Sequence, residues 1–232
     1  MTRRLSLPSS TTPMMRLASA RALVLLAALP AATLLLAGCQ SEGDGASSPE
    51  SSSSAPPEQT ARSADDDTSS SPQLSVRDLT QAARNGNRDR VRRAVTEAGL
   101  DAGASDQRGN TPLMLAAYNG HTAVVEFLLG RGAPIDARNR EGRTALMFAA
   151  TGPFPETVSL LLERGAAPNA TDKAEGWSPL MFAAAEGNQK VARHLLEHGA
   201  DPTLTDRDGE TARTFAANGS HTAVVNLLDE AE

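Results

Sequence analysis

Apolar and polar positions in the C-terminal two thirds of the chain follow a pattern that repeats every 33 or 34 residues. Each copy has a mostly apolar segment opened by Thr or Ser, a short polar turn, and a second apolar segment that ends before a glycine. A Thr or Ser side chain can accept a hydrogen bond from the first free amides of a helix. The pattern therefore predicts pairs of short helices, with the first helices at 111–117, 144–150, 178–184 and 211–217.

Residues with special backbone preferences mark the predicted helix ends. Pro112 and Pro179 directly follow the capping residue, where the missing proline N–H costs little. Gly132 can take the left-handed conformation that closes a second helix. The third copy differs, because Gly152-Pro153-Phe154-Pro155 indicates a stiff turn and a second helix beginning at Pro155. A docking point for a partner is the alternative interpretation of that apolar turn.

The copies are predicted to stack, and the outermost ones to act as caps. Alanine pairs such as Ala116-Ala117 keep one face of each first helix thin, and neither helix of a copy can bury its apolar face alone. At the front, Ser75 and Asp78 have the spacing of a capping box. At the back, Arg213 replaces a leucine of the other copies, as expected where no further neighbour covers that face.

The segment Thr111-Pro112-Leu113-Met114-Leu115-Ala116-Ala117 and its copies resemble the ankyrin repeat, with Thr-Pro-Leu-His-x-Ala-Ala as signature. Methionine stands in the histidine place at Met114, Met147 and Met181. The resemblance implies an all-α ankyrin-repeat solenoid of helix-turn-helix units with short β-hairpin loops. It divides residues 74–232 into about five repeats including the caps: 74–105, 106–138, 139–171, 172–205 and 206–232.

The resemblance also implies a non-catalytic, monomeric module that binds a protein on a concave face, built from hairpin tips and the exposed side of the first helices. Trp177 and Tyr118 stand where other copies carry mostly polar or small residues, so they are candidate anchors. Packing of Trp177 across its own hairpin is the alternative. The expected partner-binding residues are Gln107, Arg108, Asn110, Arg140, Glu141, Arg143, Lys173, Glu175, Trp177, Arg207 and Asp208 on the hairpins, and Tyr118, Asn119 and Glu186 on the first helices.

Residues 194–198, His-Leu-Leu-Glu-His, raise a different hypothesis, since some zinc hydrolases bind their metal with such a segment. Alignment gives the histidines structural roles instead: His194 takes the place of Phe127, and His198 takes that of Arg131 at a helix end, where a basic side chain suits the helix dipole. The zinc motif also lacks its third ligand. A zinc-dependent hydrolase using His194, Glu197 and His198 is therefore only the alternative function, and we expect no catalytic residue, metal or cofactor.

The N-terminal 38 residues have the composition of a targeting segment. Four arginines and no acid are followed by an apolar run from Ala22 to Leu36, which is shorter than the roughly 20 residues of a spanning helix. Leu36-Ala37-Gly38-Cys39 resembles the lipobox of bacterial lipoproteins. That resemblance implies a signal peptide at 1–38, a lipid on Cys39, and a periplasm-facing protein of a bacterial envelope. Gln40 favours the outer membrane in a Gram-negative cell, and the start is open among Met1, Met14 and Met15.

Residues 39–73 are predicted to be a disordered tether, because serine, proline and acids leave almost nothing to bury. The run Asp65-Asp66-Asp67 fits a solvated spacer better than a calcium or partner site. Removing 1–38 changes 22 basic against 28 acidic residues to 18 against 28, so the mature chain is acidic and nucleic acid is not an expected partner. A purely structural spacer is the remaining alternative function, and the sequence leaves the identity of a protein partner, and the effect on it, open.

Overall fold

A computed structural model describes residues 74–231, which form five pairs of antiparallel helices. The signal peptide, Cys39 and the tether lie outside the described residues. The first helices of the pairs are α2 (Val76–Arg84), α4 (Pro112–Tyr118), α6 (Ala145–Ala150), α8 (Pro179–Ala185) and α10 (Ala212–Asn218). The second helices are α3 (Arg88–Thr96), α5 (Thr122–Gly130), α7 (Pro155–Glu163), α9 (Gln189–Glu197) and α11 (Thr222–Asp229).

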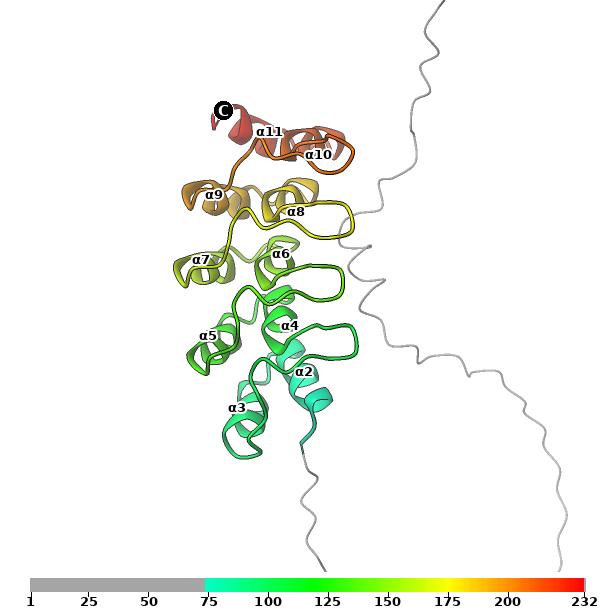
Figure 1. The fold of residues 1–232 in the computed structure, drawn as a ribbon. Coiled ribbons are helices and arrows are strands. Elements are labelled where there is room, and N and C mark those ends of the chain that lie inside the picture. The colour runs from blue at the N-terminus through cyan, green and yellow to red at the C-terminus, as the bar shows by residue number, and fades with distance from the viewer. Residues whose placement is uncertain (1–73, 232) are drawn as a thin grey trace, which may run out of the picture. The chain divides into compact units, whose positions relative to one another are not determined.

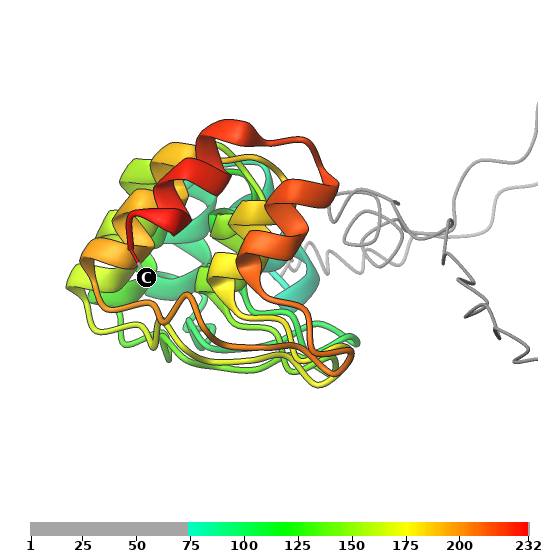
Figure 2. The ribbon, with the colours of Figure 1, turned by 90° about the horizontal axis from the view of Figure 1, so that it is seen from above.

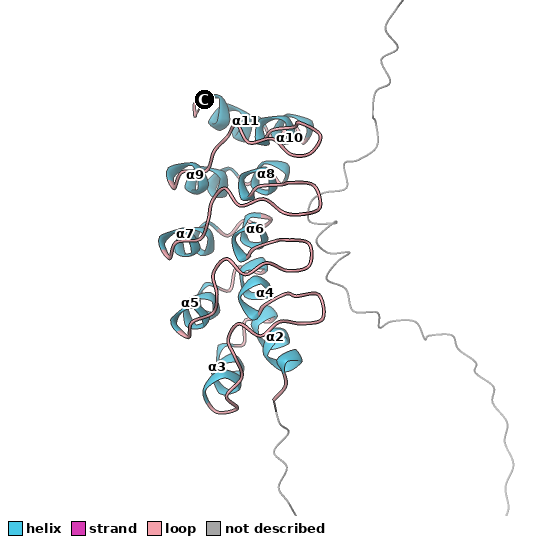
Figure 3. Ribbon diagram, in the orientation of Figure 1, coloured by secondary structure: helices cyan, strands magenta, loops and turns pink. Residues whose placement is uncertain are grey.

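The helices stack in two layers. The first helices, called the inner helices below, form one column and the second helices form the other, while long loops project beside the inner column (Figures 1 and 3). Seen along the stack, these loops overlie one another along one side of the helices (Figure 2). The predicted all-α stack of helix-turn-helix units is therefore confirmed.

Each interior inner helix begins as the sequence predicts. The Thr111 hydroxyl accepts a hydrogen bond from the Met114 backbone N–H at 3.3 Å, and the Met114 sulfur accepts one from the Thr111 N–H at 3.4 Å. The same reciprocal pair recurs in α6 and α8. Methionine sulfur thus takes the acceptor role that a glutamate has in a usual capping box.

The core is continuous from repeat to repeat. Ala116 and Ala117 are completely buried, as are Ala149 and Ala150, so neighbouring inner helices pack with little between them. Larger apolar side chains such as Leu113 and Leu128 fill the space between the two layers. No repeat contains this core alone, and each is stabilised by its neighbours.

Both ends carry polar caps. The predicted capping box is present, since Ser75 Oγ accepts from the Asp78 N–H and the Asp78 carboxylate accepts from the Ser75 N–H. At the other end Arg213 donates to the Asp229 carboxylate of α11, and this hydrogen bond lowers the pKa of Asp229 below its ordinary value. Arg213, which stands where other repeats have leucine, therefore has a hydrogen-bond partner on the outer face of the stack.

The turn between the two helices of a repeat lies beneath a side chain of the next repeat. The His221 ring lies so close to Gly187 that a Cβ there would be 2.5 Å from its Nδ1, and Gly187 has a φ of +71°. In the third repeat Phe154 lies against Gly120 in the same way, and Pro155 begins α7 as predicted. The last repeat has Ser220 with φ of +60° instead of glycine.

The loops are turns with very little strand pairing. Among residues 74–231 the one bridge found outside helices joins Thr205 and Thr211, and no strand forms. The loops reverse direction by side-chain hydrogen bonds instead. We call the surface made by these loops and the inner helices the hairpin face.

Candidate interaction surface

Four hairpin loops share one device that fixes their tips. The first residue of each tip, Asp106, Asn139, Asp172 or Asp206, accepts hydrogen bonds from backbone amides further along its own loop. Asp172 Oδ1, for example, accepts from three successive amides at 2.9 to 3.1 Å. A short Asp or Asn side chain suits this local capture of amides. The tips are thus held in one conformation.

Neighbouring hairpins are also joined to one another. The Arg140 N–H donates to the Arg108 carbonyl at 3.1 Å, the Lys173 N–H to the Glu141 carbonyl at 2.7 Å, and the Arg207 N–H to the Glu175 carbonyl at 2.9 Å. The approach is close, since a Cβ on Gly142 would lie 2.8 Å from the Lys173 amide nitrogen. The four tips therefore form one continuous row.

Most residues expected to bind a partner do lie on this face. Their side chains fall into two groups by exposure. Gln107, Arg108, Arg140, Lys173, Arg207 and Asp208 are exposed, whereas Tyr118, Asn119, Glu141, Glu175, Trp177 and Glu186 are half-buried. The half-buried Asn119 already donates to the Arg84 carbonyl at 2.8 Å, so part of its polar surface is used within the fold.

The expectation for Asn110 and Arg143 needs correction, because only 6% and 4% of their surface is exposed. The Asn110 amide contacts Asp106 and Asn139. Arg143 forms ion pairs with Glu141 at 3.1 Å and with Asp172, whose side chain is 1% exposed, at 3.3 Å. These two residues therefore hold neighbouring hairpins together and do not present an exposed side chain to a partner.

Trp177 packs within the molecule, but against the inner helices of two repeats and not across its own hairpin. Its ring centroid lies 5.1 Å from that of Phe182 in its own repeat and 4.4 Å from that of Phe215 in the next. The ring is half-buried, so one part still faces solvent. We call Trp177, Phe182 and Phe215 the aromatic cluster.

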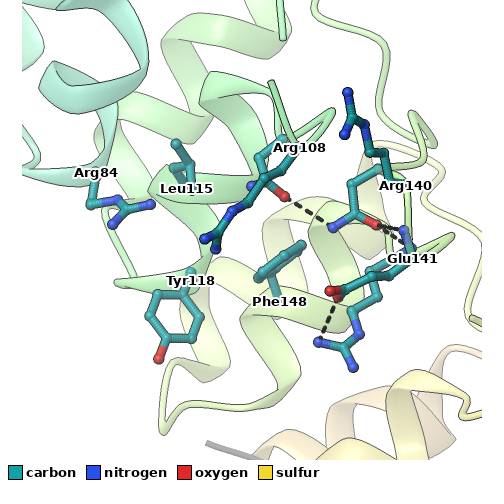
Figure 4. Close-up of a pocket in the computed structure, with 10 residues that line it drawn as sticks. Arg84, Arg108, Leu115, Tyr118, Arg140, Glu141 and Phe148 are labelled. Carbon is teal, nitrogen blue, oxygen red and sulfur yellow. Dashed lines mark hydrogen bonds and ion pairs between the residues drawn. The ribbon is translucent and has the colours of Figure 1, made fainter. Parts of the chain in front are cut away.

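Tyr118, in contrast, borders an open pocket of about 210 Å³ on the hairpin face (Figure 4). Its ring meets Phe148 edge to face, with centroids 6.0 Å apart. The pocket lies between two hairpin tips and the inner helices of the first three repeats. Its lining residues are Arg84, Arg108, Asn110, Leu115, Tyr118, Asn139, Arg140, Glu141, Arg143 and Phe148.

Some of these residues were missed in the sequence. Arg84, Leu115 and Phe148 lie on inner helices, and nothing in one repeat shows that a pocket lies beside them. The recurring Asp or Asn at 106, 139, 172 and 206 was a usable signal, because its period matches that of the repeat.

The histidines of 194–198 have the structural contacts that the alignment suggested. His198 follows the end of α9, and its Nδ1 lies 2.8 Å from the His194 carbonyl oxygen. His194 borders a shallow groove in which the positive charges of Lys190 and Arg193 outnumber the single carboxylate of Glu156, which disfavours a bound cation. Across residues 74–231 no three His, Cys, Asp or Glu side chains group closely enough to hold a metal ion.

Comparison with known proteins identifies the repeat. The family model described as "Ankyrin repeats (3 copies)" matches residues 79–172 and 153–232. The chain is also similar to "Ankyrin repeat and SAM domain-containing protein 6" of Mus musculus, at 47% identity over 49 residues. That match covers 21% of this chain and 6% of the mouse protein. In the described part of the chain, no helix combines the length and apolar character needed to span a bilayer.

Proposed function

The chain belongs to the ankyrin-repeat family, and from that premise we propose that it is a protein-binding module anchored to a bacterial envelope membrane by a lipid on Cys39. Ankyrin repeats point to protein–protein interaction. The finer proposal is that this monomeric module faces the periplasm and holds or regulates an envelope protein on its hairpin face. The outer membrane is the favoured location in a Gram-negative cell.

The observation that carries the proposal is the row of exposed side chains on ordered hairpin tips. Arg108, Arg140, Lys173 and Arg207 follow one another along the row, each in a tip fixed by its own Asp or Asn acceptor. Side chains held on an ordered backbone lose less entropy when a partner binds. Such a row suits an extended or helical segment of another protein.

A crosslinked capture from native envelopes tests the binding role. Wild-type protein is compared with an Arg140→Glu, Lys173→Glu variant, which changes two exposed tips, and with an Arg93→Glu, Arg193→Glu control on the second helices. We expect one protein to be recovered in stoichiometric yield with wild type and control but not with the hairpin variant. Equal recovery with all three would refute the hairpin face as the site, and no recovery with any would favour a spacer.

The anchor has a separate test. Changing Cys39→Ser removes the single cysteine of the chain. We expect the wild type in the membrane fraction with a lipid detectable by mass spectrometry, and the variant without the lipid and released from the membrane. A wild-type protein without lipid would remove the anchor from the proposal while leaving the binding role intact.

A further inference from the structure

We propose that the pocket above Phe148 receives an aromatic side chain of the partner, flanked in the partner's sequence by acidic residues. This inference rests on the proposed function, since it specifies what the hairpin face recognises. It follows from the same position in three successive hairpins, where two residues bring a planar group to the next phenylalanine and the third is a short asparagine beside a pocket.

The covered positions come first. Inner-helix residues Phe148, Phe182 and Phe215 occupy equivalent places in successive repeats. The Arg143 guanidinium carbon lies 5.4 Å from the Phe182 ring centroid, and the Trp177 ring lies 4.4 Å from that of Phe215. In both cases the hairpin of one repeat places a planar group on the phenylalanine of the next. Planar groups of this kind pack well on an aromatic face.

The equivalent hairpin residue before Phe148 is Asn110. Its short side chain is held by Asp106 and by Asn139, whose Nδ2 donates to the Asn110 Oδ1 at 2.9 Å. It does not extend a planar group onto the ring as arginine or tryptophan does. A pocket of about 210 Å³ lies beside it, bordered by Tyr118 and by the few exposed atoms of the buried Leu115 and Phe148. Elsewhere in this protein the equivalent space holds a planar group, the Arg143 guanidinium or the Trp177 ring. Because arginines already line this pocket, an aromatic ring is the planar group that meets no like charge there.

The charge around the pocket indicates which residues flank the bound aromatic side chain in the partner's sequence. Four arginines and one glutamate line the pocket, but Arg143 is buried and paired with both Glu141 and Asp172, so the positive charge comes from Arg84, Arg108 and Arg140. Arg84 and Arg108 extend toward each other from opposite sides of the pocket (Figure 4). This positive surface belongs to a chain with a net charge of −6. Complementary charge favours a partner segment with carboxylates beside the aromatic residue.

Two single residues of the chain provide the test. Tyr118, at the pocket, is the only tyrosine, and Trp177, in the aromatic cluster, is the only tryptophan. Full-length protein in detergent is labelled with fluorotyrosine and fluorotryptophan and titrated by fluorine NMR with the peptide Asp-Glu-Phe-Asp-Glu. Control peptides replace the phenylalanine by alanine, or all four acids by lysine. The expected result is a saturable shift of the Tyr118 signal alone, with both controls binding at least about ten-fold more weakly.

Two variants locate the effect. Asn110→Trp copies the residue of the fourth repeat and should fill the pocket, abolishing the Tyr118 shift. Because Asn110 is buried, Arg108→Glu with Arg140→Glu is the second variant, since both side chains are exposed. It should reverse the preference between acidic and lysine-flanked peptides. Arg93→Glu with Arg193→Glu is the matched control and should bind as wild type.

Equal binding of the lysine-flanked peptide, a shift at Trp177 in place of Tyr118, or no shift would each overturn the inference. A shift that appears only after deletion of residues 40–72 would also overturn it, because the acidic segment of the chain itself would then occupy the pocket. If the peptides fail while envelope capture still depends on the hairpin tips, the proposed function stands and only the pocket assignment falls. If the peptides bind but envelope capture recovers no partner, the pocket assignment stands and the proposed function falls.

Discussion

The hairpins of the second and fourth repeats have the same role in the stack but place different groups beside the next repeat. Beside the Asn110 hairpin a pocket borders the nearly buried Phe148, whereas beside the Trp177 hairpin the half-buried Phe215 is in contact with the Trp177 ring. The backbone links between hairpins are alike in both regions. The hairpin side chain is therefore a clear difference between the junction that has a pocket and the one that has an aromatic contact.

This difference separates two uses of an aromatic residue on the hairpin face. Trp177 contributes mainly to stability, because its ring contacts phenylalanines of two repeats. Tyr118 contacts Phe148 at one edge and keeps the pocket as its other neighbour. Exposure alone does not distinguish them, since both are half-buried. Four sets of substitutions test the comparison.

The largest expected change in stability follows from removing the ring of Phe182, which packs against Arg143 and Trp177. Phe182→Ala should lower the free energy of unfolding by about 4 kcal/mol, because it leaves a cavity beneath Arg143 and Trp177. Phe148→Ala should cost about 1 kcal/mol less, since the space it leaves can merge with the pocket. Urea unfolding followed by far-UV circular dichroism measures both. Equal losses would mean that the open pocket does not change the cost of truncation.

The next effect concerns the side chain that covers Phe182. Arg143→Met should destabilise by about 3 kcal/mol, because it leaves the buried Asp172 carboxylate without its cation. Adding Asp172→Asn should recover part of that loss, and the double-mutant cycle by urea unfolding gives the coupling. Additive losses would show that the two side chains act independently.

Removing the ring of Trp177 should cost less. Trp177→Asn copies the equivalent residue of the second repeat, Asn110, and should destabilise by about 2 kcal/mol, through loss of its contacts with Phe182 and Phe215. Asp208→Asn, an exposed change on the next hairpin, should stay within about 0.5 kcal/mol of wild type. Thermal unfolding compares the two. A neutral Trp177→Asn would contradict the assignment of Trp177 to packing.

The smallest effect is expected at Ser220, in the turn of the last repeat. Ser220 has a positive φ where Gly187 stands one repeat earlier. Ser220→Gly should stabilise by about 0.5 kcal/mol, because glycine adopts this conformation without steric cost. Gly187→Ser should destabilise, since its Cβ would meet the His221 ring. Thermal unfolding should move in opposite directions for the two variants, and a rise for both would show that the next repeat does not restrict this turn.

Residues whose role is local were predicted from the sequence. Thr111 caps α4, Pro155 begins α7, and Ser75 forms its capping box, because each interaction joins residues a few positions apart. Asn110 and Arg143 were misplaced for the opposite reason. Their burial depends on the next hairpin, 29 residues further along the chain.

The sequence by itself determined the repeat, its helix boundaries and its polar caps, since periodicity and capping act over one or two turns. Only the tertiary structure decided which hairpin side chains are buried, and where the stack leaves a pocket. Stacking brings Asn110 of the second repeat to the same pocket as Phe148 of the third. The same chemistry that makes arginine or tryptophan a binding residue on a free surface makes it a packing residue when the next repeat lies within reach.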